Sequence, residues 1–145
     1  MRNILTLSTL VIVLAFSGCK DDEEFSKRQT DITKLTAVAW GNPIVQHGTD
    51  GDLSDQYENF AIVFALTFND GYDGTFVVSN GGYAFPENAG KWRLSEDLNR
   101  IIFDNGREFD VEIEAKTLKM DFTVAPSGGR VAGLSGHFTF DLQPL

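Results

Sequence analysis

Residues 60–68 read FAIVFALTF and are the strongest strand signal in the chain. The even positions hold Phe, Ile, Phe, Leu and Phe, whereas the odd positions hold Ala, Val, Ala and Thr. Because successive side chains of a β-strand point to opposite faces, the large side chains are expected on one face, toward an interior. The domain built around this stretch is therefore expected to be a sheet with one deeply apolar face.

The same two-residue period recurs on both sides of this stretch, separated by turns rich in Gly, Asn and Asp. The further candidate strands cover about 37–46, 75–80, 88–95, 100–104, 107–113, 118–124 and 134–142. The sequence thus predicts eight antiparallel strands, most of them joined by short connections. Asn105-Gly106, between two of them, predicts a hairpin with a type I′ turn, which needs two residues of positive φ.

Eight such strands in an open sheet would leave the apolar face in water and two edges unpaired. Closure into a barrel removes both problems. We therefore expect an all-β domain over residues 35–145, built as an antiparallel eight-stranded up-and-down barrel. A two-sheet β-sandwich is the alternative.

The N-terminus has the three-part layout of a secretory signal peptide. Arg2 precedes an apolar run from Ile4 to Phe16, and the small residues Ser17 and Gly18 follow. A membrane-spanning helix needs roughly 20 apolar residues, which is more than this run offers. Residues 1–18 are therefore predicted to be a signal peptide, and residues 19–34 an acidic tether with at most one helical turn near 31–36.

The segment Ala15-Phe16-Ser17-Gly18-Cys19 resembles the lipobox of bacterial lipoproteins. This resemblance implies cleavage before Cys19, acylation of its thiol and its amino group, and attachment to a lipid bilayer without a spanning helix. Cys19 is the one cysteine of the chain. A secreted protein with a stray cysteine is the alternative, although an exposed thiol is a liability in an oxidising compartment.

A basic residue and four acidic ones follow directly: Lys20, Asp21, Asp22, Glu23 and Glu24. This run resembles the export signal that sends lipoproteins of Bacteroidota to the outer face of the outer membrane. The alternative is a solvated charge run at the start of a linker.

The formal charge of the chain is −9, and it becomes −10 without residues 1–18, which carry one basic residue and no acidic one. Such a domain repels nucleic acid, and no cluster of Lys and Arg overrides this balance. We therefore expect no nucleic-acid partner.

Three stretches, Gly90–Ser95, Lys116–Met120 and Leu134–Leu142, together with the lipobox, are similar to the small lipocalin-like lipoproteins of Bacteroidota. Lipocalins usually carry Gly-x-Trp on the first strand, whereas here it lies mid-chain and Trp40-Gly41 stands on the first strand. The resemblance implies a cup that holds a small hydrophobic molecule. The side chains assigned to it are Trp40, Phe64, Phe76, Trp92, Phe109 and Phe138. These rings could equally fill the barrel as packing.

Catalytic patterns are weak. The histidines form no His-Glu-x-x-His motif, Ser135 lies in no Gly-x-Ser-x-Gly turn, and there is no phosphate-binding loop. His137 is expected to face solvent from a strand. We predict a protein that is not an enzyme and has no cofactor. An acidic loop offers a weak calcium site, with solvated carboxylates as the alternative; its acids are Asp50, Asp52, Asp55 and Glu58.

Two functions remain open. The first is a surface-anchored lipoprotein that binds a small hydrophobic ligand. The second is an accessory lipoprotein that docks another cell-envelope protein through its rim loops or through the outward face at Ala61, Val63 and Ala65. An internal cavity would favour the first, and a filled barrel with an exposed apolar patch would favour the second.

Overall fold

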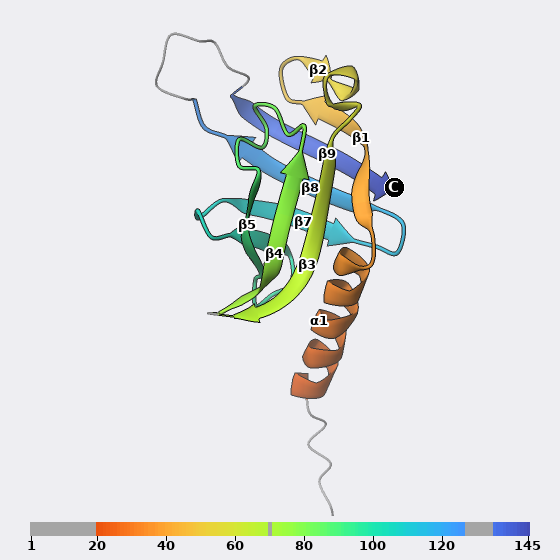
Figure 1. The fold of residues 1–145 in the computed structure, drawn as a ribbon, viewed down its shortest axis with the longest axis vertical. Helices are drawn as coiled ribbons and strands as arrows, with labels where there is room; N and C mark the ends of the chain where they lie inside the picture. The colour runs from red at the N-terminus through yellow and green to blue at the C-terminus, as the bar shows by residue number, and fades with distance from the viewer. Residues whose placement is uncertain (1–19, 70, 127–134) are drawn as a thin grey trace, which may run out of the picture.

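The computed structural model describes residues 20–69, 71–126 and 135–145, and their strands form one closed antiparallel barrel (Figure 1). Strands follow one another around the sheet in chain order, and the first pairs with the last. The barrel strands are β1 (Ala39–His47), β3 (Ala61–Asn69), β4 (Tyr72–Ser79), β5 (Ala89–Leu94), β6 (Arg100–Phe103), β7 (Glu108–Ile113), β8 (Leu118–Val124) and β9 (Gly136–Pro144). The predicted eight-stranded up-and-down barrel is confirmed, and the alternative sandwich is not formed.

The connection between β1 and β3 contains two short elements. The two-residue strand β2 (Gly51–Asp52) folds back on the end of β1, where His47 pairs with Gly51. The 3₁₀ helix η1 (Ser54–Tyr57) follows and buries the ring of Tyr57. This connection therefore packs on one end of the barrel.

The alternation predicted around β3 is present. Phe60, Ile62 and Phe64 are buried, whereas Val63 is 43% exposed on the outer face. Leu66 departs from the prediction with 42% exposure, and the pairing of β3 with β4 shifts register just after it, between Leu66 and Asn69. The side chain of Phe68 lies outside the described part of the chain.

The hairpin at Asn105-Gly106 joins β6 to β7 as predicted, but its turn is not type I′. Gly106 has a φ of 87°, and Asn105 is not among the residues of positive φ in the described chain. The Asn105 side chain accepts a hydrogen bond from the backbone N–H of Arg107 at 3.0 Å. A single positive φ at the last loop position is typical of a three-residue loop, a type I turn followed by glycine. The local hydrogen bond of Asn105 favours this loop over the two-residue one.

The N-terminal segment is a helix, so the prediction of a tether over residues 19–34 was wrong from Lys20 onward. Helix α1 (Lys20–Thr36) projects from one end of the barrel (Figure 1). Acidic residues suit its N-terminus because they complement the helix dipole. Lys27 and Asp31, four residues apart, form an ion pair at 3.3 Å. No helix of the described residues is both long and apolar enough to cross a membrane.

The last turns of α1 close the end of the barrel from which it projects. Ile32 and Leu35 are buried in the core, and the Trp40 indole N–H donates to the carbonyl of Leu35 at 2.9 Å. Arg28 pairs with Asp73 at 2.6 Å, and the backbone N–H of Leu94 donates to the same carboxylate oxygen. These contacts join α1 to residues far along the chain, which explains why the segment folds although its own sequence is mostly polar.

Aromatic rings fill much of the barrel interior. Phe76 and Phe103 stack with centroids 3.8 Å apart, and Phe64 meets Trp92 edge to face at 5.5 Å. Burying a side chain of this size contributes about 1.5–3 kcal/mol relative to leaving it exposed. The largest side chains with under 2% exposure include Trp40, Trp92, Phe60, Phe64, Phe76, Phe85, Phe103, Phe109, Phe138 and Phe140.

Candidate functional site

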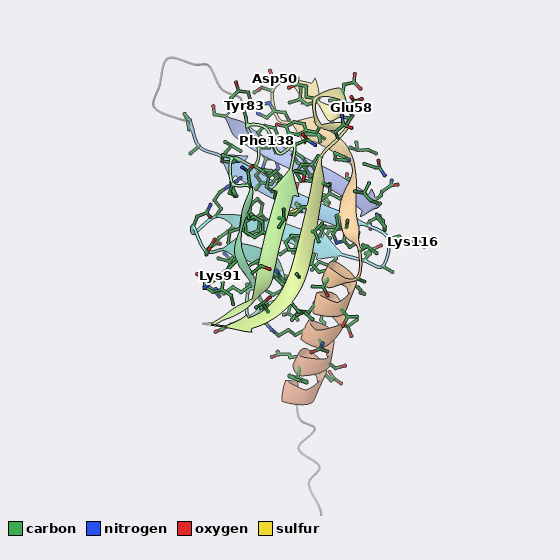
Figure 2. All side chains as sticks on the ribbon, viewed as in Figure 1. Asp50, Glu58, Tyr83, Lys91, Lys116 and Phe138 are labelled. Atoms are coloured by element: carbon green, nitrogen blue, oxygen red, sulfur yellow. The ribbon has the colours of Figure 1, made fainter. Side chains whose placement is uncertain are left out.

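The end of the barrel away from α1 is its distal end, where the connections β1–β3, β4–β5 and β6–β7 lie (Figure 1). Figure 2 shows Asp50, Glu58 and Tyr83 around this end, with Phe138 close by. The helix end is closed by α1, whereas the distal end is closed by loops. Loops that sit on a rigid scaffold are where binding residues concentrate.

The six aromatic residues assigned to a ligand from the sequence all lie in the packed interior, with at most 2% exposure. Both indole N–H groups are used by the backbone: Trp40 donates to Leu35, and Trp92 donates to the carbonyl of Thr75 at 2.9 Å. The rings of Phe109 and Phe138 lie at 5.0 Å and 5.8 Å from the ring of Phe122. These residues therefore share one core, and their rings contact other rings in this conformation.

Phe85 enters this core from the β4–β5 connection (residues 80–88) rather than from a strand. It is 1% exposed, and its ring lies 5.1–5.5 Å from four others: Phe60, Phe109, Phe122 and Phe140. Its backbone N–H donates to the carbonyl of Gly81, and a Cβ on Gly81 would lie only 2.6 Å from Phe85 atoms. The loop thus folds tightly on itself and places one ring in the distal end of the barrel. Sequence reasoning missed Phe85 because residues 80–88 have no two-residue period; its one signal is an aromatic residue between Gly-Gly and Pro.

Arg107, also missed from the sequence, places its guanidinium over three rings. The guanidinium carbon lies 4.9 Å from the centroid of Phe109, 5.4 Å from that of Phe122 and 5.6 Å from that of Phe85. A cation over a ring face is attracted by about 0.5–2 kcal/mol. The distal end therefore combines an apolar interior with one fixed positive charge.

Glu87 neutralises this charge from the same loop that carries Phe85. One guanidinium nitrogen of Arg107 donates to both carboxylate oxygens of Glu87, at 2.6 Å and 2.8 Å. The other donates to the carbonyl of Ala84 at 2.9 Å. The side chains are 23% exposed for Arg107 and 11% for Glu87. All three of these hydrogen bonds thus tie the guanidinium to the β4–β5 connection.

Tyr57 holds this connection from the opposite side. Burial raises the pKa of the Tyr57 hydroxyl, and a hydrogen bond with the backbone of Ala84 acts against that rise. The Tyr57 ring also meets Phe140 edge to face at 5.0 Å. Ala84 therefore lies between Tyr57 and Arg107.

The acidic loop does not gather its carboxylates. Asp50 lies 3.0 Å from Nδ1 of the buried His47, and Asp52 accepts from the hydroxyl and the N–H of Ser54, which lowers the pKa of Asp52. Glu58 accepts from the neighbouring amide of Asn59, and Asp55 is exposed. Among the described residues, no group of three or more His, Cys, Asp or Glu side chains could hold a metal ion.

The remaining assigned residues lie elsewhere. Cys19 falls outside the described residues, and Lys20 to Glu24 form the first turn of α1, with Glu23 and Glu24 exposed. His137 faces solvent from β9 as expected, with its side chain 57% exposed.

No protein-family model matches this chain, and no curated protein matches it in sequence. Function is therefore inferred from the barrel and the residues at its distal end.

Proposed function

We propose that this chain is a membrane-anchored, surface-exposed lipoprotein whose barrel binds a small hydrophobic ligand at its distal end, without catalysis. The observation that carries the proposal is the position of Phe85. Its ring occupies apolar space inside the barrel, yet it is held by a loop and not by the sheet. Ligand sites are mostly apolar with a few convergent polar groups, and this end has that composition. Rings fill the interior in this conformation, so the ligand would take the place of the Phe85 ring and would not enter an existing cavity.

Ligand entry would exchange one apolar group for another. When residues 80–88 lift, the Phe85 ring leaves contacts with four rings that remain on β3, β7, β8 and β9 or directly beside them. A hydrophobic molecule of similar width restores those contacts. The interior would therefore bind a ligand at the cost of moving one loop and of losing its hydrogen bond from the Val78 N–H to the Asn88 carbonyl, while the pairing between the barrel strands is kept.

The experiment is a titration of the purified full chain with retinol, a neutral apolar probe, followed by fluorescence. Saturable binding is expected, and Phe85→Ala should bind more tightly because the vacated space is apolar and remains dry until a ligand fills it. Ile44→Ala, at a half-exposed position on the outside of β1, is the matched control and should behave as the unaltered chain. Absence of saturable binding in both the unaltered chain and Phe85→Ala would exclude this function.

The anchor is proposed from Cys19 and the run after it, which are similar to lipoproteins of the Bacteroidota outer membrane. Helix α1 begins at the next residue and spans about 25 Å at 1.5 Å per residue. An acylated Cys19 would therefore put the helix end toward the bilayer and let the distal end face away from it. This orientation suits capture of a ligand from outside.

Cell fractionation tests the anchor. Cys19→Ala should move the protein from the membrane fraction to the soluble fraction, and replacing the acidic residues at 21–24 by Ala should leave it lipidated but protected from protease added to intact cells. Retention of Cys19→Ala in the membrane fraction would contradict the lipid anchor. Cleavage of the variant with Ala at 21–24 at the same rate as the unaltered chain would contradict the export signal.

An outward apolar row favours docking of another envelope protein as a second candidate. Ala39, Val63, Val77 and Ala89 are successive partners across β1, β3, β4 and β5, and Val63 and Val77 are 43% and 54% exposed. By contrast, β7 and β8 present acidic and basic side chains outward. Contiguous exposed apolar surface marks interaction sites.

A photo-crosslinking amino acid at position 77, with position 112 as the control, tests docking in intact cells. One discrete adduct from position 77 and none from 112 is the expected result. No adduct from position 77 would remove this candidate and leave ligand binding unaffected.

A further inference from the structure

The distal end carries a charge that a purely apolar ligand would leave unpaired. The backbone of Arg107 is fixed to the barrel wall: its carbonyl accepts from Phe103 at 2.9 Å, and its N–H donates to the Asn105 side chain. The carboxylate that neutralises Arg107 sits on the β4–β5 connection, two residues after Phe85. Phe85 and Glu87 therefore leave together when that connection lifts, and Arg107 stays.

A half-buried guanidinium over aromatic rings is costly without an anion, because it has given up part of its hydration. The Arg107 guanidinium makes three hydrogen bonds to the β4–β5 connection, and the opening would remove all of them. A neutral apolar ligand would replace the Phe85 ring and restore none of these contacts. A ligand with an anionic head beside its apolar part would replace both the ring and the carboxylate.

We propose that the distal end selects amphipathic carboxylic acids, with the apolar part in the place of the Phe85 ring and the carboxylate on Arg107 in exchange for Glu87. The guanidinium fork can donate two parallel hydrogen bonds to a planar carboxylate. In the closed state one of its nitrogens donates to both oxygens of Glu87 and the other donates to the Ala84 carbonyl, so a carboxylate ligand could take the place of both partners. Ion pairing is exchanged and no proton moves, while the released Glu87 becomes hydrated. The inference rests on the proposed binding of an apolar ligand and adds its head group.

The formal charge of the domain does not prevent this selection. Charges more than about 8 Å apart across solvent are largely screened at physiological salt, whereas a guanidinium in direct contact is not. The ligand therefore meets Arg107 locally, and the general acidity of the chain slows its approach only at low salt.

The test compares decanoate with 1-decanol, which share the chain length and differ in the head group, by calorimetric titration of the full chain. Decanoate should bind roughly tenfold more tightly or better, as a charge-assisted hydrogen-bonded pair provides. Arg107→Gln should remove this preference. Arg93→Gln, which alters an outward-facing arginine of β5, is the matched control and should keep it.

Glu87→Gln provides a second variant that leaves the arginine in place. It removes the competing carboxylate and weakens the closed state, so decanoate should bind several-fold more tightly while the preference over 1-decanol persists. Circular dichroism of each variant shows whether the barrel is retained. If Arg107→Gln does not fold, the affinity of Glu87→Gln for decanoate decides: unchanged or weaker binding would contradict the exchange of Glu87 for the ligand carboxylate.

The outcomes separate this inference from the function on which it rests. Equal affinity for decanoate and 1-decanol in the unaltered chain would overturn the head-group selection and leave apolar binding standing. A preference for decanoate that survives in Arg107→Gln would also overturn it. Failure of both probes to bind the unaltered chain and Phe85→Ala would remove the proposed function itself, and the inference with it.

Discussion

Both ends of the barrel are closed by a segment outside the barrel wall, and each closure includes an arginine paired with a carboxylate. At the helix end, Arg28 pairs with Asp73 beside the rim, and the apolar side chains of Ile32 and Leu35 face the core. At the distal end, Arg107 itself lies over the core rings, and its partner Glu87 belongs to the closing loop. An arginine–carboxylate pair thus lies outside the core at the helix end and against the core at the distal end.

Under the proposed function, the helix closure is fixed and the distal closure exchanges for a ligand. At the helix end, the Trp40 indole is bonded to the backbone of the closing helix, so a small molecule cannot reproduce the contact without unfolding α1. At the distal end, a ring and a carboxylate lie against the core beside one hydrogen bond from Arg107 to the Ala84 carbonyl, and both of these side-chain groups occur in small molecules. We therefore expect changes at the helix end to affect stability alone, and changes at the distal end to affect binding as well.

The largest expected effect that tests this contrast comes from Leu35→Ala. Leu35 is fully buried, so its truncation should lower the free energy of unfolding by about 2–5 kcal/mol, measured by urea unfolding. Retinol affinity should stay within about twofold of the unaltered chain, because the space left by the truncated Leu35 side chain lies at the helix end, away from the proposed ligand site. Thr33→Ala, exposed on the same helix, should change stability by no more than about 0.5 kcal/mol. A marked gain of retinol binding in Leu35→Ala would show that the two ends are equivalent.

A smaller effect is expected from Arg28→Met, which removes the ion pair at the rim. Arg28 is 31% exposed and its partner Asp73 keeps the hydrogen bond from Leu94, so the loss should be about 1 kcal/mol. High salt should reduce the difference between the variant and the unaltered chain, as screening weakens a rim pair. Head-group preference should not change, in contrast to Arg107→Gln. A change in the preference for decanoate over 1-decanol would mean that Arg28 also affects ligand binding at the distal end.

The barrel wall was predictable because its signals are local. Residues 60–68 alternate large and small side chains, and this period alone places Phe60, Ile62 and Phe64 inside. Asn105-Gly106 locates a hairpin, although the choice between its turn types depends on a hydrogen bond to Arg107 that no dipeptide rule includes. Eight such strands leave few ways to cover one apolar face, so closure follows from the count of strands.

The closures of the two ends were not predictable because their contacts span long distances in the chain. Helix α1 is polar through residue 30 except for Phe25, and it folds onto Trp40, Asp73 and Ser95, the last of which lies 67 residues from Arg28. Phe85 lies in a stretch with no periodicity, and Glu87 is 20 residues from Arg107. An isolated helix of this length is marginal in water, so its presence depends on packing that the sequence does not display. The candidate site is therefore a product of the fold, while the wall around it is a product of local pattern.

The smallest expected effect concerns Tyr57, which holds Ala84 at the distal end. Its pKa is raised by burial, so the folded chain keeps the phenolic proton at pH values where the unfolded chain has lost it. The corresponding stability is fully present below the unfolded pKa of about 10 and decreases as pH rises above it. The free energy of unfolding should therefore fall between about pH 8 and about pH 11, and the fall should be smaller in Tyr57→Phe than in the unaltered chain. Urea unfolding at both pH values measures the difference. If the two chains lose stability equally, the pKa of Tyr57 is the same in the folded and unfolded chains. Tyr57 then makes no pH-dependent contribution at the distal end.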